Sequence, residues 1–128
     1  MDHFFSATLH QSSAPFSHLT THNGVAYTAG IIGQDRSTGE LTSNNVSEQC
    51  ELMMENLGVL LSENELTWSQ VMRTTVYLTS YDDFNAVNEE YARWLTEPYP
   101  ARTTIQVAAL PLGASVQIEA IIATDDSA

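Results

Sequence analysis

Apolar residues recur at helical spacing over two stretches of the chain. In the first stretch, Asn45 is followed three residues later by Glu48, a pairing typical of a helix N-terminus, where both side chains cap backbone N–H groups. The apolar positions beyond it fall on one helical face: Val46, Cys50, Met53, Leu57 and Leu60. This pattern predicts an amphipathic helix that begins at residue 46.

The second helical stretch follows Ser80. Ser80 and Asp83 favour a helix start, and Pro98 and Pro100 end the pattern because proline lacks a backbone N–H and clashes with the preceding turn. The inner face is expected to carry Phe84, Val87, Tyr91 and Trp94. The chain therefore holds two predicted helices, each with an apolar face that needs a partner surface.

Strands are predicted before and between these helices. Residues 4 to 10 and 16 to 21 resemble short strands, and Asn23-Gly24 favours a tight hairpin turn because both residues accept positive φ. Gly39 lies near the tip of a second turn, QDRSTGE. The stretch VMRTTVYLTS is rich in β-branched residues and predicts a strand over 71–80.

Along the last segment, successive side chains are expected to point to opposite faces, as they do in a β-strand. We expect 103–109 and 116–122 to form a hairpin around PLGA. The predicted core face consists of Thr103, Ile105, Val107, Ala109, Val116, Ile118, Ala120 and Ile122. The opposite face would gather Arg102, Thr104, Gln106, Gln117 and Glu119. Because Ala108, Leu110 and Ile121 interrupt this polar face, we expect another subunit to cover part of it.

Composition limits the class of protein. With 128 residues, 43% of them hydrophobic, the chain is expected to form one globular domain over 1–128. Its 16 acidic and 4 basic residues give a formal charge of -12, which disfavours binding to a nucleic-acid backbone. The same charge is consistent with plain solubility or with a salt-rich habitat. Because lysine is absent, a side-chain Schiff base is excluded.

Several other kinds of chemistry are also disfavoured. The start MDHFFSATLHQ lacks signal-peptide features and no apolar run approaches the ~20 residues that span a bilayer, so we expect a cytoplasmic protein without a membrane partner. Cys50 lies on the apolar face of the first helix and is expected to be buried and unreactive. His18 and His22 lack a third ligand at suitable spacing, so no metal site is expected.

Three stretches carry a resemblance to a known family: GVAYTAGIIGQDRSTGEL, RTTVYLTSYDDFNAVNEEY and PARTTIQVAALPLGASVQIEAI. In order, and from about Ala14 to Ala123, they resemble the RidA (YjgF/YER/L-PSP) family of imine and enamine deaminases. The resemblance implies an α+β fold, in which a mostly antiparallel sheet is backed by two helices. It also implies a homotrimer with a central barrel and ligand clefts between subunits. The implied reaction is the cofactor-free hydrolysis of reactive 2-imino acids to 2-oxo acids and ammonia.

The resemblance assigns roles to individual residues. Arg102 would bind the substrate carboxylate, for which its planar guanidinium is suited, although an arginine that pairs with a carboxylate of its own or a neighbouring chain is the alternative. Gly30 would contribute backbone to the cleft. Asn88 would form hydrogen bonds near the ligand, or else satisfy a loop carbonyl.

Four positions depart from the family pattern, and all fall where the cleft is expected. Phe16 replaces the usual tyrosine, Ala29 the usual serine and Thr104 the usual cysteine. Gln117 replaces the acid that orients the attacking water; an amide can position water but cannot accept its proton. Glu119 lies two residues further on and is the nearby acid that could substitute, or it could face a donor of a neighbouring subunit.

Two hypotheses about function follow from these residues. The first is a cofactor-free deaminase with an altered substrate range, in which Arg102, Gln117 and Glu119 are the catalytic candidates. The second is a non-catalytic trimer of the same fold that binds small carboxylates or acts as a stress-related interaction protein. Ribonuclease activity, also attached to the family, is disfavoured by the negative charge.

Overall fold

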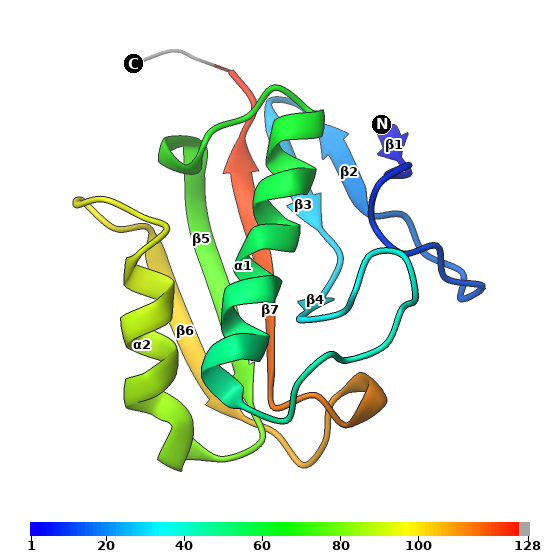
Figure 1. Ribbon diagram of the computed structural model, residues 1–128. Helices are drawn as coiled ribbons and strands as arrows, with labels where there is room; N and C mark the ends of the chain where they lie inside the picture. The colour runs from blue at the N-terminus through cyan, green and yellow to red at the C-terminus, as the bar shows by residue number, and fades with distance from the viewer. Residues whose placement is uncertain (126–128) are drawn as a thin grey trace.

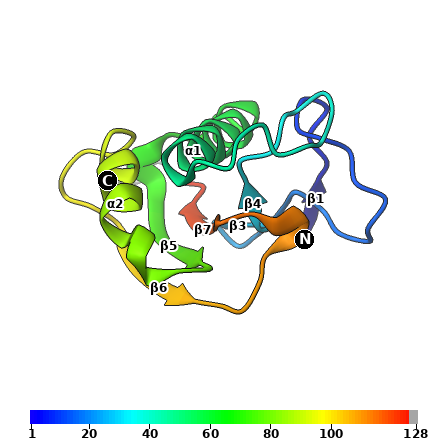
Figure 2. The same ribbon diagram turned by 60° about the horizontal axis from the view of Figure 1, so that its bottom comes forward.

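A mixed β-sheet with two helices on one face makes up the molecule. The computed structural model describes residues 1–125, and its helices are α1 (Val46–Glu63) and α2 (Phe84–Ala92) (Figure 1). Turning the molecule shows that both helices lie on the same side of the sheet (Figure 2). The predicted α+β class is therefore confirmed. Within residues 1–125, no helix is both long and apolar enough to cross a membrane.

The sheet has seven strands in the order β1-β2-β3-β7-β5-β6, with β4 paired to β7. The strands are β1 (Asp2–Phe4), β2 (Leu19–His22), β3 (Val25–Thr28), β4 (Ile31–Ile32), β5 (Val71–Leu78), β6 (Ala101–Gln106) and β7 (Val116–Ala123). Three short 3-10 helices are η1 (Trp68–Gln70), η2 (Tyr81–Asp83) and η3 (Pro111–Gly113). Each strand pair is antiparallel except β5 with β6, which makes the sheet mixed.

Both helices form where the apolar spacing predicts them. The Asn45 side chain accepts a hydrogen bond from the Glu48 backbone N–H at 3.0 Å, as expected for an N-cap. On α1, Cys50, Met53 and Leu57 are fully buried against the sheet. On α2, Val87 and Tyr91 are buried and Phe84 packs against the core, as predicted; Trp94 also packs against the core, but it lies beyond the end of the helix at Ala92.

The N-terminal strand predictions are only partly correct. The hairpin between β2 and β3 turns at Asn23 and Gly24, with φ of 50° and 80°. The strand predicted over residues 4–10 is wrong, because β1 ends at Phe4. Beyond it, the Ser6 hydroxyl accepts hydrogen bonds from the backbone N–H groups of Thr8 and Leu9. These local bonds satisfy donors that a strand would have used in a ladder.

The predicted C-terminal hairpin is wrong. β6 and β7 do not pair with each other: β6 runs parallel to β5, with Thr74 opposite Arg102, and β7 runs antiparallel to the other edge of β5, with Thr74 opposite Ala120. The connection between β6 and β7 therefore passes the end of β5. The predicted core face holds for β7, whose Val116, Ile118, Ala120 and Ile122 are buried, but not for β6, where Ile105 is 46% exposed.

Candidate functional site

Arg102 lies between the sheet and helix α2. Because Thr74 faces the helices and stands opposite Arg102, the arginine side chain shares that face of the sheet. Its guanidinium carbon lies 4.5 Å from the centre of the Tyr91 ring and 5.9 Å from that of Phe84. Its Nε donates a hydrogen bond to the Thr104 hydroxyl at 2.8 Å. We call Arg102, Thr104, Asn88, Phe84 and Tyr91 the arginine half-site.

The charge of Arg102 is not neutralised by the parts of the chain that the structure describes. The ion pairs found within residues 1–125 join Arg36 to Glu55 and Arg93 to Glu90. Burial lowers the pKa of the Arg102 guanidinium, and the nearby Tyr91 opposes this shift. One terminal nitrogen, Nη2, is buried without a hydrogen-bond partner. A desolvated guanidinium with free donors favours a bound carboxylate.

Asn88 lies on the same face of α2 as the two rings. It follows Phe84 by four residues and precedes Tyr91 by three, so the three side chains are neighbours on the helix surface. Its Oδ1 is buried and has no hydrogen-bond partner among the described residues. The alternative that Asn88 satisfies a loop carbonyl is not seen in the hydrogen bonds of residues 1–125, so the hydrogen-bonding groups of this side chain are not used by the described residues.

Four other predicted site residues lie together elsewhere on the chain. Phe16, Ala29, Gly30 and Gln117 all line one cavity of about 840 Å³. Its other walls come from the N-terminal segment 9–18, from the β4 region and from the η3 loop, with Leu9, Ile31, Ile32 and Leu112 as apolar members. We call Phe16, Ala29, Gly30 and Gln117 the glutamine half-site.

Gly30 allows Gln117 to lie directly over the backbone. A β-carbon built on Gly30 would approach the Gln117 amide nitrogen to 2.7 Å, closer than real β-carbons come to other atoms. Because β4 and β7 pair with Ile31 opposite Ile118 and Ile32 opposite Gln117, the two residues are held in this contact by the sheet itself. The amide of Gln117 can donate and accept hydrogen bonds here, but it cannot take a proton from water.

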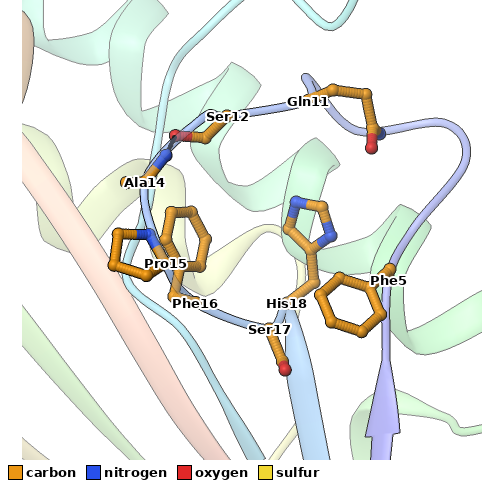
Figure 3. A pocket seen from close by; sticks show the side chains of 8 residues that line it. All are labelled: Phe5, Gln11, Ser12, Ala14, Pro15, Phe16, Ser17 and His18. Atoms are coloured by element: carbon orange, nitrogen blue, oxygen red, sulfur yellow. Dashed lines mark hydrogen bonds between the residues drawn. The ribbon is translucent and has the colours of Figure 1, made fainter.

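Phe16 and His18 line both this cavity and a second, smaller one of about 410 Å³, whose lining residues Figure 3 shows. Their rings meet edge to face, with centres 5.9 Å apart. The His18 Nδ1 accepts a hydrogen bond from the Ser6 backbone N–H, so in the neutral ring the proton is on Nε2. His10 and His18 are the titratable side chains among the residues that line the larger cavity.

Glu119 does not line the larger cavity. It lies on the face of the sheet opposite the helices, where it accepts a hydrogen bond from the Tyr77 hydroxyl at 2.9 Å. Burial, followed by this hydrogen bond and the carboxylate charge, raises the pKa of Tyr77. Glu119 is therefore already engaged by its own chain.

The structure corrects the prediction that all five polar residues of the C-terminal segment share a face. Gln117 pairs with Tyr77 on the face away from the helices, whereas Arg102 and Thr104 point toward α2. The parallel pairing of β6 with β5 sets this arrangement, because it turns the even-numbered residues of β6 to the helix side. Within one chain, the two half-sites lie on opposite faces of the sheet.

Sequence reasoning missed the two rings beside Arg102. The helical spacing of Phe84 and Tyr91 predicts core positions, whereas their contact with the Arg102 guanidinium depends on which strand the helix covers. Cys50 behaves as predicted: it is fully buried, and desolvation, with a contribution from Glu90, raises the pKa of its thiol to about 12. Among residues 1–125, no three His, Cys, Asp or Glu side chains come together as metal ligands.

Comparison with known proteins identifies the family. The family model described as Endoribonuclease L-PSP matches residues 7–124, so the chain belongs to this family, which is the RidA/YjgF/L-PSP family. Relatives include Reactive Intermediate Deaminase A of Arabidopsis thaliana, 39% identical over 107 residues, which span 84% of this chain and 57% of that protein. The human 2-iminobutanoate/2-iminopropanoate deaminase is 38% identical over 84% of this chain and 78% of its own length.

Solved structures confirm the fold. RidA from the Antarctic bacterium Psychrobacter sp. PAMC 21119 superposes with a TM-score of 0.90 at 31% identity, over 96% of this chain and 99% of that one. E. coli TdcF with bound serine gives a TM-score of 0.90 at 26% identity, over 98% and 100% of the two chains. The sequence resemblance to the RidA family is thereby confirmed, and the relatives support a deaminase family.

Proposed function

We propose that this protein is a cofactor-free deaminase that hydrolyses reactive 2-imino or enamino acids to 2-oxo acids and ammonia. The observation that carries the proposal is the Arg102 guanidinium, which is partly buried and has no carboxylate partner within residues 1–125. In a chain with a formal charge of -12, such a group is the local cation that an anionic substrate requires. The names of the relatives support the same chemistry.

The proposal includes a homotrimer, in which the arginine half-site of one subunit meets the glutamine half-site of the next. Two different surface patches that join in this way form a head-to-tail interface, which closes into a ring when the rotation permits. The exposed apolar residues favour such an assembly: Phe16, Tyr27, Ile105 and Leu112 are each 46–62% exposed. The central barrel and the shared clefts belong to the proposal on the same grounds.

In the proposed reaction, water adds to the carbon of the C=N bond, and the resulting carbinolamine loses ammonia to leave a carbonyl. For a protonated imine, the water supplies the carbonyl oxygen and its two protons leave on nitrogen as ammonium. Arg102 binds the carboxylate, and the Gln117 amide, fixed over Gly30, orients the water by hydrogen bonding. No cofactor takes part in these steps. Which imino acid is preferred depends on the groups that line the cavity beside Gln117.

A second candidate, a non-catalytic trimer that binds small carboxylates, is favoured by one specific observation. Gln117 cannot act as a base, and the nearest acid, Glu119, is engaged by Tyr77 outside the cavity. Such a protein would retain carboxylate binding through Arg102 but would not exceed the uncatalysed rate of imine hydrolysis. The proposal of a deaminase is preferred because an imine is already reactive toward water.

The test is turnover of 2-imino acids generated in situ by an amino-acid oxidase. We expect the protein to accelerate 2-oxo acid formation above the spontaneous rate and Arg102→Ala to abolish the acceleration with an unchanged melting temperature. Arg73→Ala is the matched control, because Arg73 is an exposed arginine that contacts Thr103. If the unmodified protein and Arg102→Ala gave the same rate, the proposed deaminase activity would be refuted. If the unmodified protein still bound 2-oxo acids, the non-catalytic carboxylate-binding trimer would replace it.

A further inference from the structure

The orientation of Arg102 is not set by an acid. Within residues 1–125, its side chain forms one hydrogen bond, from Nε to the Thr104 hydroxyl, and its terminal nitrogens have no protein acceptor. An arginine side chain has many rotamers, so one hydrogen bond leaves the plane of the guanidinium free to rotate. Some other contact must hold that plane if the guanidinium is to bind a carboxylate in one fixed orientation.

The Tyr91 ring supplies this contact. At 4.5 Å from its centre, the guanidinium carbon lies within the range of a cation–π interaction, and it is nearer than to the Phe84 ring at 5.9 Å. A guanidinium also stacks on an aromatic face in a way that a lysine ammonium does not. Tyr91 is 5% exposed, so water has little access to the ring.

The Tyr91 ring is itself held in place by a hydrogen bond at its hydroxyl group. The Tyr91 hydroxyl and the Thr74 hydroxyl form a hydrogen bond of 2.8 Å, and Thr74 is 1% exposed. Thr74 stands directly opposite Arg102 in the parallel pairing of β5 and β6. The same strand register therefore places Arg102 next to Thr74, the residue that fixes the Tyr91 ring.

We propose that Tyr91 is a positioning residue for substrate binding: its ring, fixed by Thr74, holds the plane of the Arg102 guanidinium in the orientation that binds the ligand carboxylate. The proposal deepens the deaminase function and rests on it for the identity of the ligand. The stacking itself does not depend on that function. Tyr91 does not touch the reacting atoms, so its effect is on binding and orientation rather than on bond making.

The first test is binding of 2-oxobutanoate, measured by calorimetry. Tyr91→Leu removes the ring and is expected to weaken binding about tenfold, whereas Tyr91→Phe keeps the ring but loses the hydrogen bond to Thr74 and is expected to weaken binding only about two- to fivefold. Tyr99→Leu is the matched control, since Tyr99 is 50% exposed and lies outside the half-site. A folded Tyr91→Leu variant with unchanged affinity, beside a loss of binding in Arg102→Ala, would overturn the proposal.

The second test needs no ligand. The four basic residues are all arginines, so a nitrogen–proton NMR spectrum of the arginine Nε–H groups holds four signals, and Arg102→Ala assigns one of them. We expect the Arg102 signal to be displaced by the ring current of Tyr91, to remain displaced but broaden or move in Tyr91→Phe, which loses the hydrogen bond to Thr74, and to lose the displacement in Tyr91→Leu. If Tyr91→Leu does not fold, Thr74→Val replaces it, because it keeps the core filled and frees the ring.

The two tests separate the failure of each idea. If 2-oxobutanoate does not bind the unmodified protein, the proposed function fails, and the Arg102 signal alone decides the positioning role. In Thr74→Val, we expect the Arg102 signal to broaden or move and the affinity for 2-oxobutanoate to fall about two- to fivefold, as for one lost hydrogen bond. An Arg102 signal that is the same in the unmodified protein, Tyr91→Leu and Thr74→Val would show that Tyr91 only fills the core.

Discussion

Replacing Gln117 with glutamate puts a proton acceptor into the glutamine half-site and tests whether this position orients the attacking water. The two side chains have almost the same size, so the new carboxylate is expected to occupy the place of the amide above Gly30. General-base assistance typically contributes ~10²- to 10⁴-fold to a rate, and the same range bounds the increase expected for Gln117→Glu. The rate of imine hydrolysis should increase in this variant whether the unmodified protein is a deaminase or a carboxylate-binding protein that has lost its acid, but the starting rates would differ.

The structure lets the electrostatic effect of this change be estimated. Gln117 and Glu119 are two residues apart on one face of β7, so the two carboxylates would lie about 7 Å apart. Their repulsion is then roughly 0.6 kcal/mol in water and about 2.4 kcal/mol at the effective dielectric of a protein surface. Keeping a carboxyl protonated at neutral pH requires about 3.7 kcal/mol, so the new group stays ionised and can accept a proton.

The assay follows 2-oxo acid formation from imines made in situ, as a function of pH. Because repulsion from Glu119 raises the pKa of the new carboxyl, the rate of Gln117→Glu should fall as pH decreases through that pKa. The folded state then binds more protons than the unfolded state, so the variant is destabilised at neutral pH and regains stability in acid. Asn44→Asp, an exposed change of the same charge, controls for the general effect of one more acid. A folded Gln117→Glu variant without a rate increase would refute the assignment of Gln117 to the water.

Three further predictions concern single residues. Gly30→Ala should displace the Gln117 side chain, because the new β-carbon would lie 2.7 Å from its amide nitrogen. We expect turnover to fall with little change in melting temperature; unchanged turnover would show that activity does not depend on this contact. Asn45→Ala should reduce the free energy of unfolding by ~1 kcal/mol, because the Glu48 N–H loses its cap, and denaturant unfolding measures the loss. Cys50, with a pKa of about 12 and no exposed surface, should react with a thiol reagent only after unfolding; rapid labelling of the native protein would contradict its burial.

The features that the sequence predicted correctly depend on local spacing. The apolar repeat of α1 and the Asn45 cap are properties of a few neighbouring residues, and the helix begins where they predict. The positive φ of Asn23 and Gly24 is a local preference of the same kind. The alternation in β7 also predicted its buried face, because β7 lies inside the sheet between strands on both sides. Motif resemblance, rather than spacing, singled out Arg102 and Gly30.

Only the tertiary structure decided which face of the sheet each half-site occupies. Alternation shows that Arg102 and Thr104 share a face, but a strand at the sheet edge carries no local signal for its neighbour or its direction. The register in which Thr74 lies opposite both Arg102 and Ala120 comes from long-range pairing, in which β5 separates β6 from β7. That pairing turns Arg102 toward Tyr91 and away from Gln117. The physical reason is that strand order is set by burying the apolar faces of both helices on one sheet, a property of the whole chain rather than of any segment.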